Sequence, residues 1–220
     1  MAFYATYFTN YYGLKLKRAS SVQEKKQLRI EFTSRILNRL NIEIQVINRE
    51  KLPQDGKYLL VSNHRSVVDP LIIEFATKDT NLFGHWISKK ELYNSFFFGL
   101  FVRNGGAILL DRKAKQMGGF FSDIKECVKS GDSIYIFPEG TRNTKEGLGE
   151  FKEGSKIIAL KNRLPILPLY IRTNANNTLM EALKGKTQKR VIEVVIGDTI
   201  DYKDKSLSLE NAYKQQFNLL

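Results

Sequence analysis

The chain has 220 residues, one cysteine and a formal net charge of +12, so it is long enough to bury its own core without a disulfide or a structural metal. The charge favours polyanionic partners such as nucleic acid, an anionic lipid surface or phosphorylated and acidic substrates. No apolar stretch approaches the ~18 residues of a membrane-spanning helix, and the N-terminus lacks the pattern of a cleavable signal peptide. We therefore expect one domain, or one domain with a small appendage, that is neither secreted nor membrane-spanning.

The first fourteen residues are rich in aromatic and apolar side chains at three- and four-residue spacing, which predicts a helix with most of them on one face: Phe3, Tyr4, Tyr7, Phe8, Tyr11, Tyr12 and Leu14. Lys15, Lys17 and Arg18 follow at once. Rings at headgroup depth beside cations that meet anionic phosphates are what an interfacial membrane anchor requires. The alternative is a stripe that packs on the protein's own core. The adjoining charge favours the membrane.

A second amphipathic helix is expected over residues 22–40. Its apolar stripe consists of Leu28, Phe32, Ile36 and Leu40. Its basic side chains fall mostly off this stripe, on a face that solvent or a membrane surface would meet: Lys25, Lys26, Arg29, Arg35 and Arg39. We therefore predict that residues 1–40 form N-terminal amphipathic, membrane-associating helices and that residues 41–220 form the main domain.

From Ile42 onward, apolar runs typical of strands alternate with helical patterns. Strands are expected at 42–46, 58–62, 83–88, 107–110, 133–137, 166–172 and 191–196, and helices at 69–77, 113–129, 153–162 and 207–217. The polar, basic segment 174–190 is predicted to be a long surface loop. This alternation predicts an α/β fold with a mixed, mostly parallel central sheet flanked by helices.

A histidine and an aspartate five residues apart, His64 and Asp69, follow the strand that ends near Ser62. Imidazole titrates near neutrality and a carboxylate can fix its tautomer, so the pair suits a general base and the acid that orients it. The spacing alone is a weak signal, because short motifs arise by chance. Ser62 and Ser66 flank His64, so a Ser–His–Asp hydrolase is an alternative. Neither serine lies in the Gly-x-Ser-x-Gly turn of such hydrolases.

The sequence Phe-Pro-Glu-Gly-Thr-Arg-Asn at 137–143 comes directly after a predicted strand. Proline ends the strand, and Gly140 allows the backbone to approach a ligand closely. Glu139, Thr141 and Arg142 then present an acid, a hydroxyl and a guanidinium at the carboxyl end of the strand, where open α/β sheets bind ligands. A plain turn with a surface ion pair is the alternative.

The remaining residues with chemical potential indicate structural roles. His85, beside Trp86, is expected to be a structural histidine, and Cys127 a buried, inert thiol on an amphipathic helix. Two histidines and one cysteine make a zinc site improbable. The glycine pairs at 105–106 and 118–119 lack the spacing of a nucleotide-binding loop, so neither a metal nor a cofactor is expected.

Four blocks of the chain, in the correct order, resemble the motifs of the glycerolipid acyltransferase family, whose type member acylates 1-acylglycerol 3-phosphate. The blocks are residues 63–69, 106–112, 137–142 and 164–169, and the segments 88–92 and 151–154 are also similar. Several ordered blocks are far more specific than any one motif. The resemblance implies transfer of a fatty acyl group from a thioester, on acyl carrier protein or coenzyme A, to a glycerolipid hydroxyl.

The resemblance also assigns roles to individual residues. His64 would be the general base that removes the hydroxyl proton, with Asp69 orienting it. The substrate-binding residues would be Arg112, Glu139, Gly140, Thr141, Arg142 and Lys89. The two arginines offer bidentate donors for an acceptor phosphate, with Lys89 a weaker candidate, and a backbone N–H near Gly140 is a candidate oxyanion donor. An ordinary surface pair between Asp111 and Arg112 is the alternative for that arginine.

We therefore predict acylation of 1-acylglycerol 3-phosphate to phosphatidic acid by a peripheral or monotopic protein on the cytoplasmic face of the cell membrane. The expected partners are an acyl-ACP or acyl-CoA donor, lysophosphatidic acid and an anionic membrane surface. One alternative is the same chemistry on another lysophospholipid, glycerol 3-phosphate or an amino-lipid. A distant alternative is a basic nucleic-acid-binding module, which would need a basic groove with stacking aromatics. No helix-turn-helix or RNA-binding signature is present, so no nucleic acid partner is expected.

Overall fold

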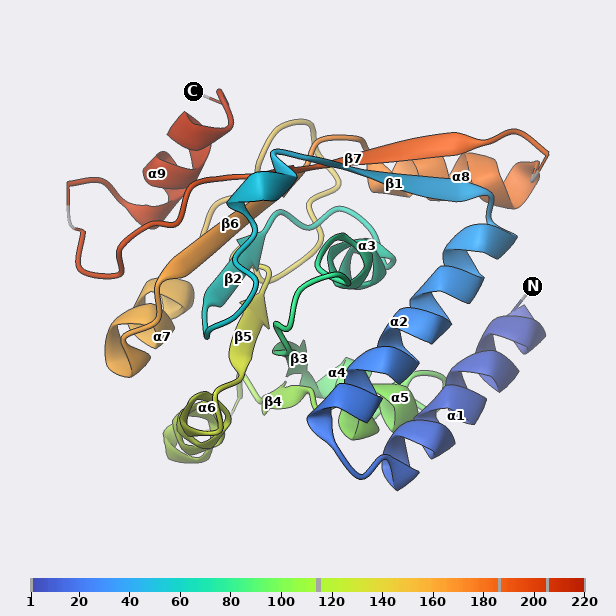
Figure 1. The fold of residues 1–220 in the computed structure, drawn as a ribbon, viewed down its shortest axis with the longest axis horizontal. Helices are drawn as coiled ribbons and strands as arrows, with labels where there is room; N and C mark the ends of the chain where they lie inside the picture. The colour runs from blue at the N-terminus through green and yellow to red at the C-terminus, as the bar shows by residue number, and fades with distance from the viewer. Residues whose placement is uncertain (1, 114–115, 186, 205, 220) are drawn as a thin grey trace.

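A computed structural model describes residues 2–113, 116–185, 187–204 and 206–219 of the chain, with side chains described from Thr6 onward. Helices and strands alternate along most of its length (Figure 1). The helices are α1 (Ala2–Arg18), α2 (Val22–Arg39), η1 (Arg49–Lys51), α3 (Asp69–Ala76), α4 (Lys90–Tyr93), α5 (Gly99–Asn104), α6 (Gly118–Lys129), α7 (Gly154–Asn162), α8 (Ala175–Lys184) and α9 (Leu209–Gln216). The strands are β1 (Ile42–Ile47), β2 (Leu59–Ser62), β3 (Gly84–Lys89), β4 (Ile108–Leu110), β5 (Ser133–Ile136), β6 (Ile166–Ile171) and β7 (Arg190–Ile196).

The strands form one seven-stranded sheet in the order β1-β7-β6-β2-β5-β3-β4. All neighbouring pairs are parallel except β6 and β7. Every residue of β2 and of β6 is buried, which is the pattern of parallel strands covered on both faces. The prediction of an α/β fold with a mixed, mostly parallel sheet flanked by helices is therefore confirmed.

Helices cover both faces of this sheet. Successive residues of β2 alternate between two core clusters, with Leu60 in one and Leu59 and Val61 in the other. The first cluster includes buried residues of α2, α3 and α8, and the second includes buried residues of α6, α7 and α9. Figure 1 accordingly shows these two groups of helices on opposite sides of the central strands.

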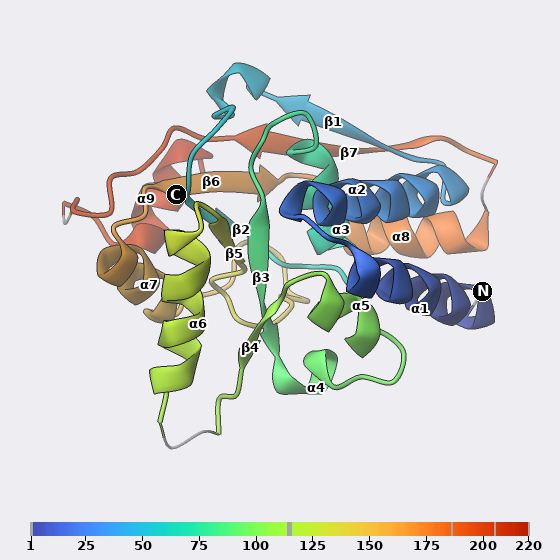
Figure 2. The same cartoon turned by 60° about the horizontal axis from the view of Figure 1, so that its bottom comes forward.

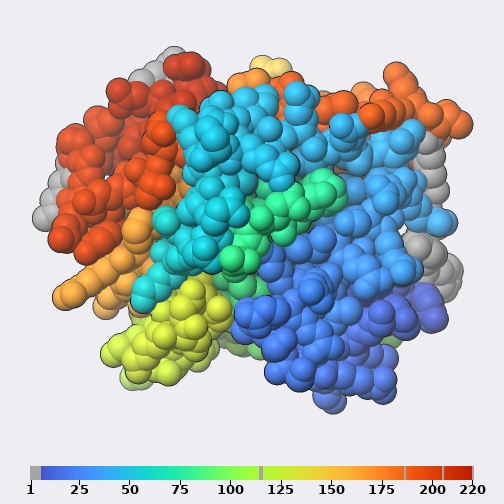
Figure 3. All heavy atoms as spheres, in the orientation of Figure 1, coloured from blue at the N-terminus to red at the C-terminus, as the bar shows by residue number. Residues whose placement is uncertain are grey.

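The N-terminal helices form a third, smaller core with α5. Phe8 and Tyr12 of α1 pack against Phe32 of α2, and the Phe32 ring lies 4.5 Å from that of Phe101. Tyr7 and its outward-facing neighbours on α1 remain exposed, and the side chains of Phe3 and Tyr4 lie outside the described residues. In Figure 3, α1 and α2 form a continuous part of one face. Part of the aromatic stripe thus packs internally, as the alternative expects, and part faces outward, where contact with a membrane stays a prediction.

Within the described part of the chain, no helix is both long and apolar enough to cross a bilayer. Residues 1–40 contain two helices, as expected from their spacing. Their association with a membrane, and the division of the chain at residue 40, stay predictions.

The prediction of a long surface loop over 174–190 is wrong, because this segment contains α8. Its buried residues recur at helical spacing within a polar sequence: Ala175, Thr178, Leu179 and Ala182. Asn174 caps the helix, and its side chain accepts the N–H of Asn177 at 3.1 Å. The helix was not predicted because the segment is polar overall and its apolar stripe is narrow.

Three further differences concern helices and one charged side chain. The short helices α4 and α5 are not predicted, because helices of one or two turns show little periodicity. The helix expected from Lys113 begins at Gly118. The prediction that Arg29 is a solvated cation of the second helix is wrong, because Arg29 is only 4% exposed and pairs with Glu74 of α3. Sequence spacing cannot reveal a partner on another helix.

Candidate active site

The residues proposed for the site come from four segments. The sheet brings these segments together at one edge, which the carboxyl ends of its parallel strands form. Strands β2, β3, β4 and β5 are parallel, so their carboxyl ends lie on the same side of the sheet. His64 follows β2, Lys89 ends β3, Arg112 follows β4 and the 137–142 turn follows β5. This edge is where open α/β sheets bind ligands.

His64 and Asp69 form the predicted pair. The Nδ1 atom of His64 lies 2.8 Å from Oδ2 of Asp69, which is buried at the first turn of α3. The same oxygen accepts the backbone N–H groups of Arg65 at 2.6 Å and Ser66 at 2.7 Å. Because Oδ2 is an acceptor, the imidazole proton sits on Nδ1 and leaves Nε2 as the basic atom. The arrangement can therefore accept a proton at Nε2 and stabilise the resulting imidazolium.

A stack of aromatic rings fixes the plane of the His64 ring. The ring centroids of His64 and Phe137 lie 4.0 Å apart, and the two ring planes differ by 8°. The ring of Trp86 stacks on Phe137 in turn, with centroids 4.8 Å apart and an interplanar angle of 24°. Trp86 Nε1 in turn donates to Glu74 Oε1 at 2.8 Å. Neither Phe137 nor Trp86 is predicted from the sequence to be a site residue. The sequence signal that could indicate these two residues is an aromatic residue directly after one strand and another within the neighbouring strand.

Glu139 holds the backbone around His64. Its side chain is buried, and its two carboxylate oxygens accept the N–H of His64 at 2.6 Å and the N–H of Gly149 at 2.8 Å. Burial raises the pKa of Glu139, and these two amide hydrogen bonds act in the opposite direction. The N–H of Asn143 also donates to the carbonyl of His64 at 2.7 Å. The predicted contact of Glu139 with substrate stays a prediction, beside this clear structural role.

Asn63 anchors the same segment on its other side. Its side chain donates to the carbonyl of Ile171 at 3.0 Å and accepts the N–H of that residue at 2.8 Å. The hydroxyl of the buried Tyr213 accepts the N–H of Asn63 at 3.3 Å and donates to the carbonyl of Leu169 at 2.6 Å. The residue before His64 is thus fixed to β6. No role for Asn63 is predicted from the sequence, because its partners lie more than a hundred positions away along the chain.

Gly140 makes a tight turn that brings Arg112 to the 137–142 segment. Its backbone has φ +72°, which favours glycine, and its N–H donates to the carbonyl of Phe137 at 2.9 Å. That N–H is therefore occupied and does not serve as an oxyanion donor in this conformation. The carbonyl of Gly140 accepts Nη2 of Arg112 at 2.5 Å.

Three cations at this edge have no carboxylate partner among the described residues. Arg112 is exposed and bonds only to a carbonyl, while Asp111 pairs with Lys90 at 2.7 Å, so the alternative of an Asp111–Arg112 pair is not formed. The side chains of Arg142, Lys89 and Thr141 are exposed, and none of the three makes a hydrogen bond or ion pair with any described residue. Unpaired cations near a base are available to an anionic ligand.

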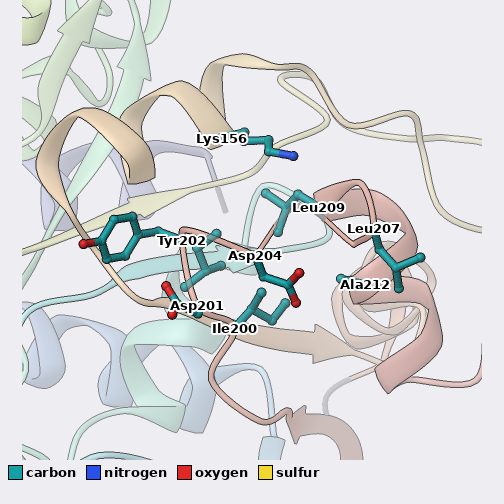
Figure 4. Close-up of a pocket in the computed structure, with 9 residues that line it drawn as sticks. Lys156, Ile200, Asp201, Tyr202, Asp204, Leu207, Leu209 and Ala212 are labelled. Atoms are coloured by element: carbon teal, nitrogen blue, oxygen red, sulfur yellow. The ribbon is translucent and has the colours of Figure 1, made fainter.

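Other chemical groups stand apart from this edge. His85 bonds to the carbonyl of Gly106 at 2.6 Å and to Asp132 at 2.9 Å, so it is structural as predicted. Cys127 lies on α6, half-buried, and burial raises the pKa of its thiol to about 11, which fits an inert thiol. A cavity of about 20 Å³ lies near the start of β6, at the opposite edge of the sheet (Figure 4). It has room for about one water and none for a lipid.

Replacing Gly149 by alanine is expected to disturb the His64 segment. A Cβ at this position would overlap Oε2 of Glu139 and displace the carboxylate that holds the N–H of His64. We expect a loss of about 1–3 kcal/mol in the free energy of unfolding, measured by urea denaturation. Gly154→Ala is the matched control, since a Cβ there meets no atom within 4 Å. Equal stabilities of the two variants would contradict the role given to Glu139.

Comparison with known proteins gives consistent matches. The model of the Acyltransferase family matches residues 43–172. A 1-acyl-sn-glycerol-3-phosphate acyltransferase of Helicobacter pylori is 36% identical over 67% of this chain and 64% of its own length. One from Streptococcus pneumoniae is 31% identical over 71% of this chain and 55% of its own length. The match thus spans less than two thirds of each of these two relatives.

One solved structure has the same fold. The crystal structure of a 1-acyl-sn-glycerophosphate acyltransferase from Thermotoga maritima superposes with a TM-score of 0.70 over 98% of this chain and 86% of that one. The sequences are 22% identical, so this likeness concerns the fold. It agrees with the mixed sheet and flanking helices described above.

Proposed function

This chain belongs to the acyltransferase family, among the glycerolipid acyltransferases, and on that premise we propose that it converts 1-acylglycerol 3-phosphate to phosphatidic acid. The observation that carries the proposal is a His64–Asp69 pair beside unpaired cations at one sheet edge. The names of the relatives from Helicobacter pylori and Streptococcus pneumoniae support the same acceptor.

His64 acts as a general base in the proposed reaction. The acceptor oxygen attacks the carbonyl carbon of the acyl thioester while its proton passes to Nε2 of His64. The carbon–sulfur bond then breaks, and the leaving thiolate takes the proton from the imidazolium. Asp69 stabilises that imidazolium through Nδ1. The thioester is already activated, so the acyl group passes directly to the acceptor and no acyl-enzyme forms. The donor is an acyl group on acyl carrier protein or coenzyme A.

The acceptor phosphate is held by Arg112 and Arg142, with Lys89 beside them. A phosphomonoester carries nearly two negative charges, and guanidinium groups bind it through paired N–H donors. Arg112 is anchored through Gly140 to the segment that also carries Arg142. Thr141 and Gly140 border the glycerol in this arrangement. The matched acceptor for a test is monoacylglycerol, which has the same hydroxyl and no phosphate. We expect it to react much more slowly than 1-acylglycerol 3-phosphate.

Arg142→Ala is expected to weaken acceptor binding more than it slows the chemical step. A hydrogen bond to a charged group is worth ~1.5–3 kcal/mol, so the KM for 1-acylglycerol 3-phosphate should rise by about 10- to 100-fold with little change in kcat. Steady-state kinetics with the acceptor varied measure this. Lys145→Ala removes an exposed cation from the same loop and should leave KM nearly unchanged. An unchanged KM in the Arg142 variant would contradict its phosphate role.

The protein is proposed to work as a peripheral or monotopic enzyme on the anionic cytoplasmic face of the cell membrane. Its net charge of +12 and the exposed cations Lys17 and Arg18 at the end of α1 support attraction to anionic lipid. Exposed rings of α1 support contact at headgroup depth, with Tyr7 71% exposed. Its lysolipid acceptor is then drawn from the bilayer that the enzyme contacts.

A further inference from the structure

Three consecutive phenylalanines are displayed on the surface between α4 and α5. Phe96 is 83% exposed, Phe97 53% and Phe98 46%. Single apolar side chains on a surface are ordinary, whereas a contiguous run of large rings marks an interaction site or an aggregation hazard. We call residues 95–98 the phenylalanine turn. Neither the catalytic pair nor the proposed phosphate site uses it.

The phenylalanine turn is a formed structure and not a loose loop. The Ser95 hydroxyl accepts the N–H groups of Phe97 at 3.2 Å and Phe98 at 3.3 Å, and its carbonyl accepts the N–H of Gly99 at 2.8 Å. The carbonyl of Phe98 accepts the N–H of Val102 at 2.9 Å within the start of α5. Because these groups are bonded internally, the turn can enter an apolar medium with less loss of hydrogen bonding to water.

The turn is continuous with the helices already proposed to meet a membrane. Helix α5, which follows the turn, packs along α1, and Asn104 of α5 donates to the carbonyl of Gly13 at 2.9 Å. A Cβ on Gly13 would touch the backbone of α5, so the two helices lie in close contact. Figure 2 shows α5 between α1 and α4. Tyr7, Tyr11 and Leu14 are exposed on α1, with Lys17 and Arg18 beyond them.

The turn also begins close to the proposed active site. Helix α4 starts directly after Lys89, at the sheet edge that carries His64. Lys90 of α4 pairs with Asp111, the neighbour of Arg112. A partner surface that binds the phenylalanine turn would therefore lie beside the cations proposed for the acceptor phosphate. Charge complementarity favours an anionic surface there, because Lys89, Arg112 and Arg142 have no acidic partner among the described residues.

We propose that the phenylalanine turn is a second membrane contact, which inserts its rings into an anionic bilayer beside the mouth of the active site. Together with α1 it would seat the protein by two elements, so that a lysolipid reaches His64 without leaving the bilayer. The inference rests on the proposed function only in taking the substrate to be a lipid.

Vesicle binding by the full chain tests the proposal. Phe96→Ser/Phe97→Ser removes the two most exposed rings of the turn, and Met180→Ser/Leu183→Ser removes two exposed apolar side chains from α8, which lies away from α4 and α5 in both views. Affinity for phosphatidylcholine vesicles that contain phosphatidylglycerol should fall by about tenfold or more in the first variant and less than about twofold in the second, because binding scales with buried apolar area. Equal affinity of the first variant and the wild type overturns the proposal.

Depth of insertion gives an independent readout. Phe96→Trp should be quenched by brominated lipids above the background of the native Trp86, whereas Leu183→Trp should not. Loss of self-association in the double phenylalanine variant with unchanged vesicle binding would show that a second copy covers the turn, and would overturn the proposal.

Activity separates this proposal from the proposed function. On short-chain 1-acylglycerol 3-phosphate dispersed as monomers, the double phenylalanine variant should keep the wild-type rate, and it should lose rate only on vesicle-bound substrate. A wild-type protein that makes no phosphatidic acid would defeat the proposed function, while the binding and quenching results would still decide the membrane contact.

Discussion

Replacing His64 by alanine should lower the rate of phosphatidic acid formation by about 10²–10⁴-fold, the usual contribution of a general base. An alcohol is a poor nucleophile at neutral pH, and no other described side chain shares the hydrogen bond to Asp69. The fold should survive, because the backbone of this segment is held by Glu139 and Asn63 independently of the imidazole. Initial rates with saturating acceptor and thioester measure the effect.

The chain offers a matched control in its other histidine. His85 is 15% exposed at its side chain, close to the 18% of His64, and it also bonds to an aspartate. His85→Gln should therefore lower the melting temperature without a comparable loss of rate. A His64→Ala protein that is folded and keeps its rate within about tenfold of the wild type would contradict the assignment of the base.

Breaking the buried ion pair between Arg29 and Glu74 should have the largest effect on stability. Burial lowers the pKa of Arg29 to about 10, which leaves the guanidinium charged at neutral pH. The guanidinium of Arg29 also donates to the carbonyls of Gly84 at 2.9 Å and Gly105 at 3.2 Å. Arg29→Met would leave Glu74 buried without its counter-charge, at a cost of about 3–5 kcal/mol in the free energy of unfolding.

Urea denaturation compares this variant with Arg35→Met on the same helix. Arg35 pairs with Glu31 at 2.8 Å, but its side chain is 58% exposed, so its loss should cost less than about 1 kcal/mol. Arg29→Met/Glu74→Met should recover part of the loss, because it leaves no lone charge. Similar costs for Arg29→Met and Arg35→Met would refute the role of the buried pair.

The buried pair also links stability to the site. Glu74 accepts the indole N–H of Trp86, and that ring supports Phe137, on which His64 stacks. A chain of contacts thus runs from α2 to the proposed base. Helix α2, which is predicted to associate with a membrane, therefore also contributes to the packing behind the candidate active site.

Local sequence patterns predicted most of the sheet and part of the candidate site, for a physical reason. Buried parallel strands are short apolar runs with clear ends, and ligand-binding groups follow those ends, so the positions of His64 and Glu139 could be read from neighbouring residues. The roles of Arg112 and Lys89 were implied by the family resemblance. The parallel register then brings them to one edge without further information.

The missed features depend on contacts between distant segments. Arg29 looked like a solvated cation because its partner Glu74 lies on another helix. The stack of Phe137 and Trp86 joins neighbouring strands whose pairing no local pattern specifies. Glu139 lies in a clear sequence motif. Its hydrogen bonds with the backbone N–H groups of His64 and Gly149, however, form only when the turns have folded. Local periodicity specifies elements, whereas tertiary packing assigns roles to side chains.

Acylation of the hydroxyl of 1-acylglycerol 3-phosphate is the activity proposed for this chain. The most direct test incubates the purified chain with acyl-ACP or acyl-CoA and, in parallel, with 1-acylglycerol 3-phosphate, other lysophospholipids, glycerol 3-phosphate and an amino-lipid, and identifies products by mass spectrometry. We predict phosphatidic acid as the main product with at least one donor, and its loss in the His64→Ala protein. Acylation of another acceptor, with no phosphatidic acid from either donor, would contradict the account.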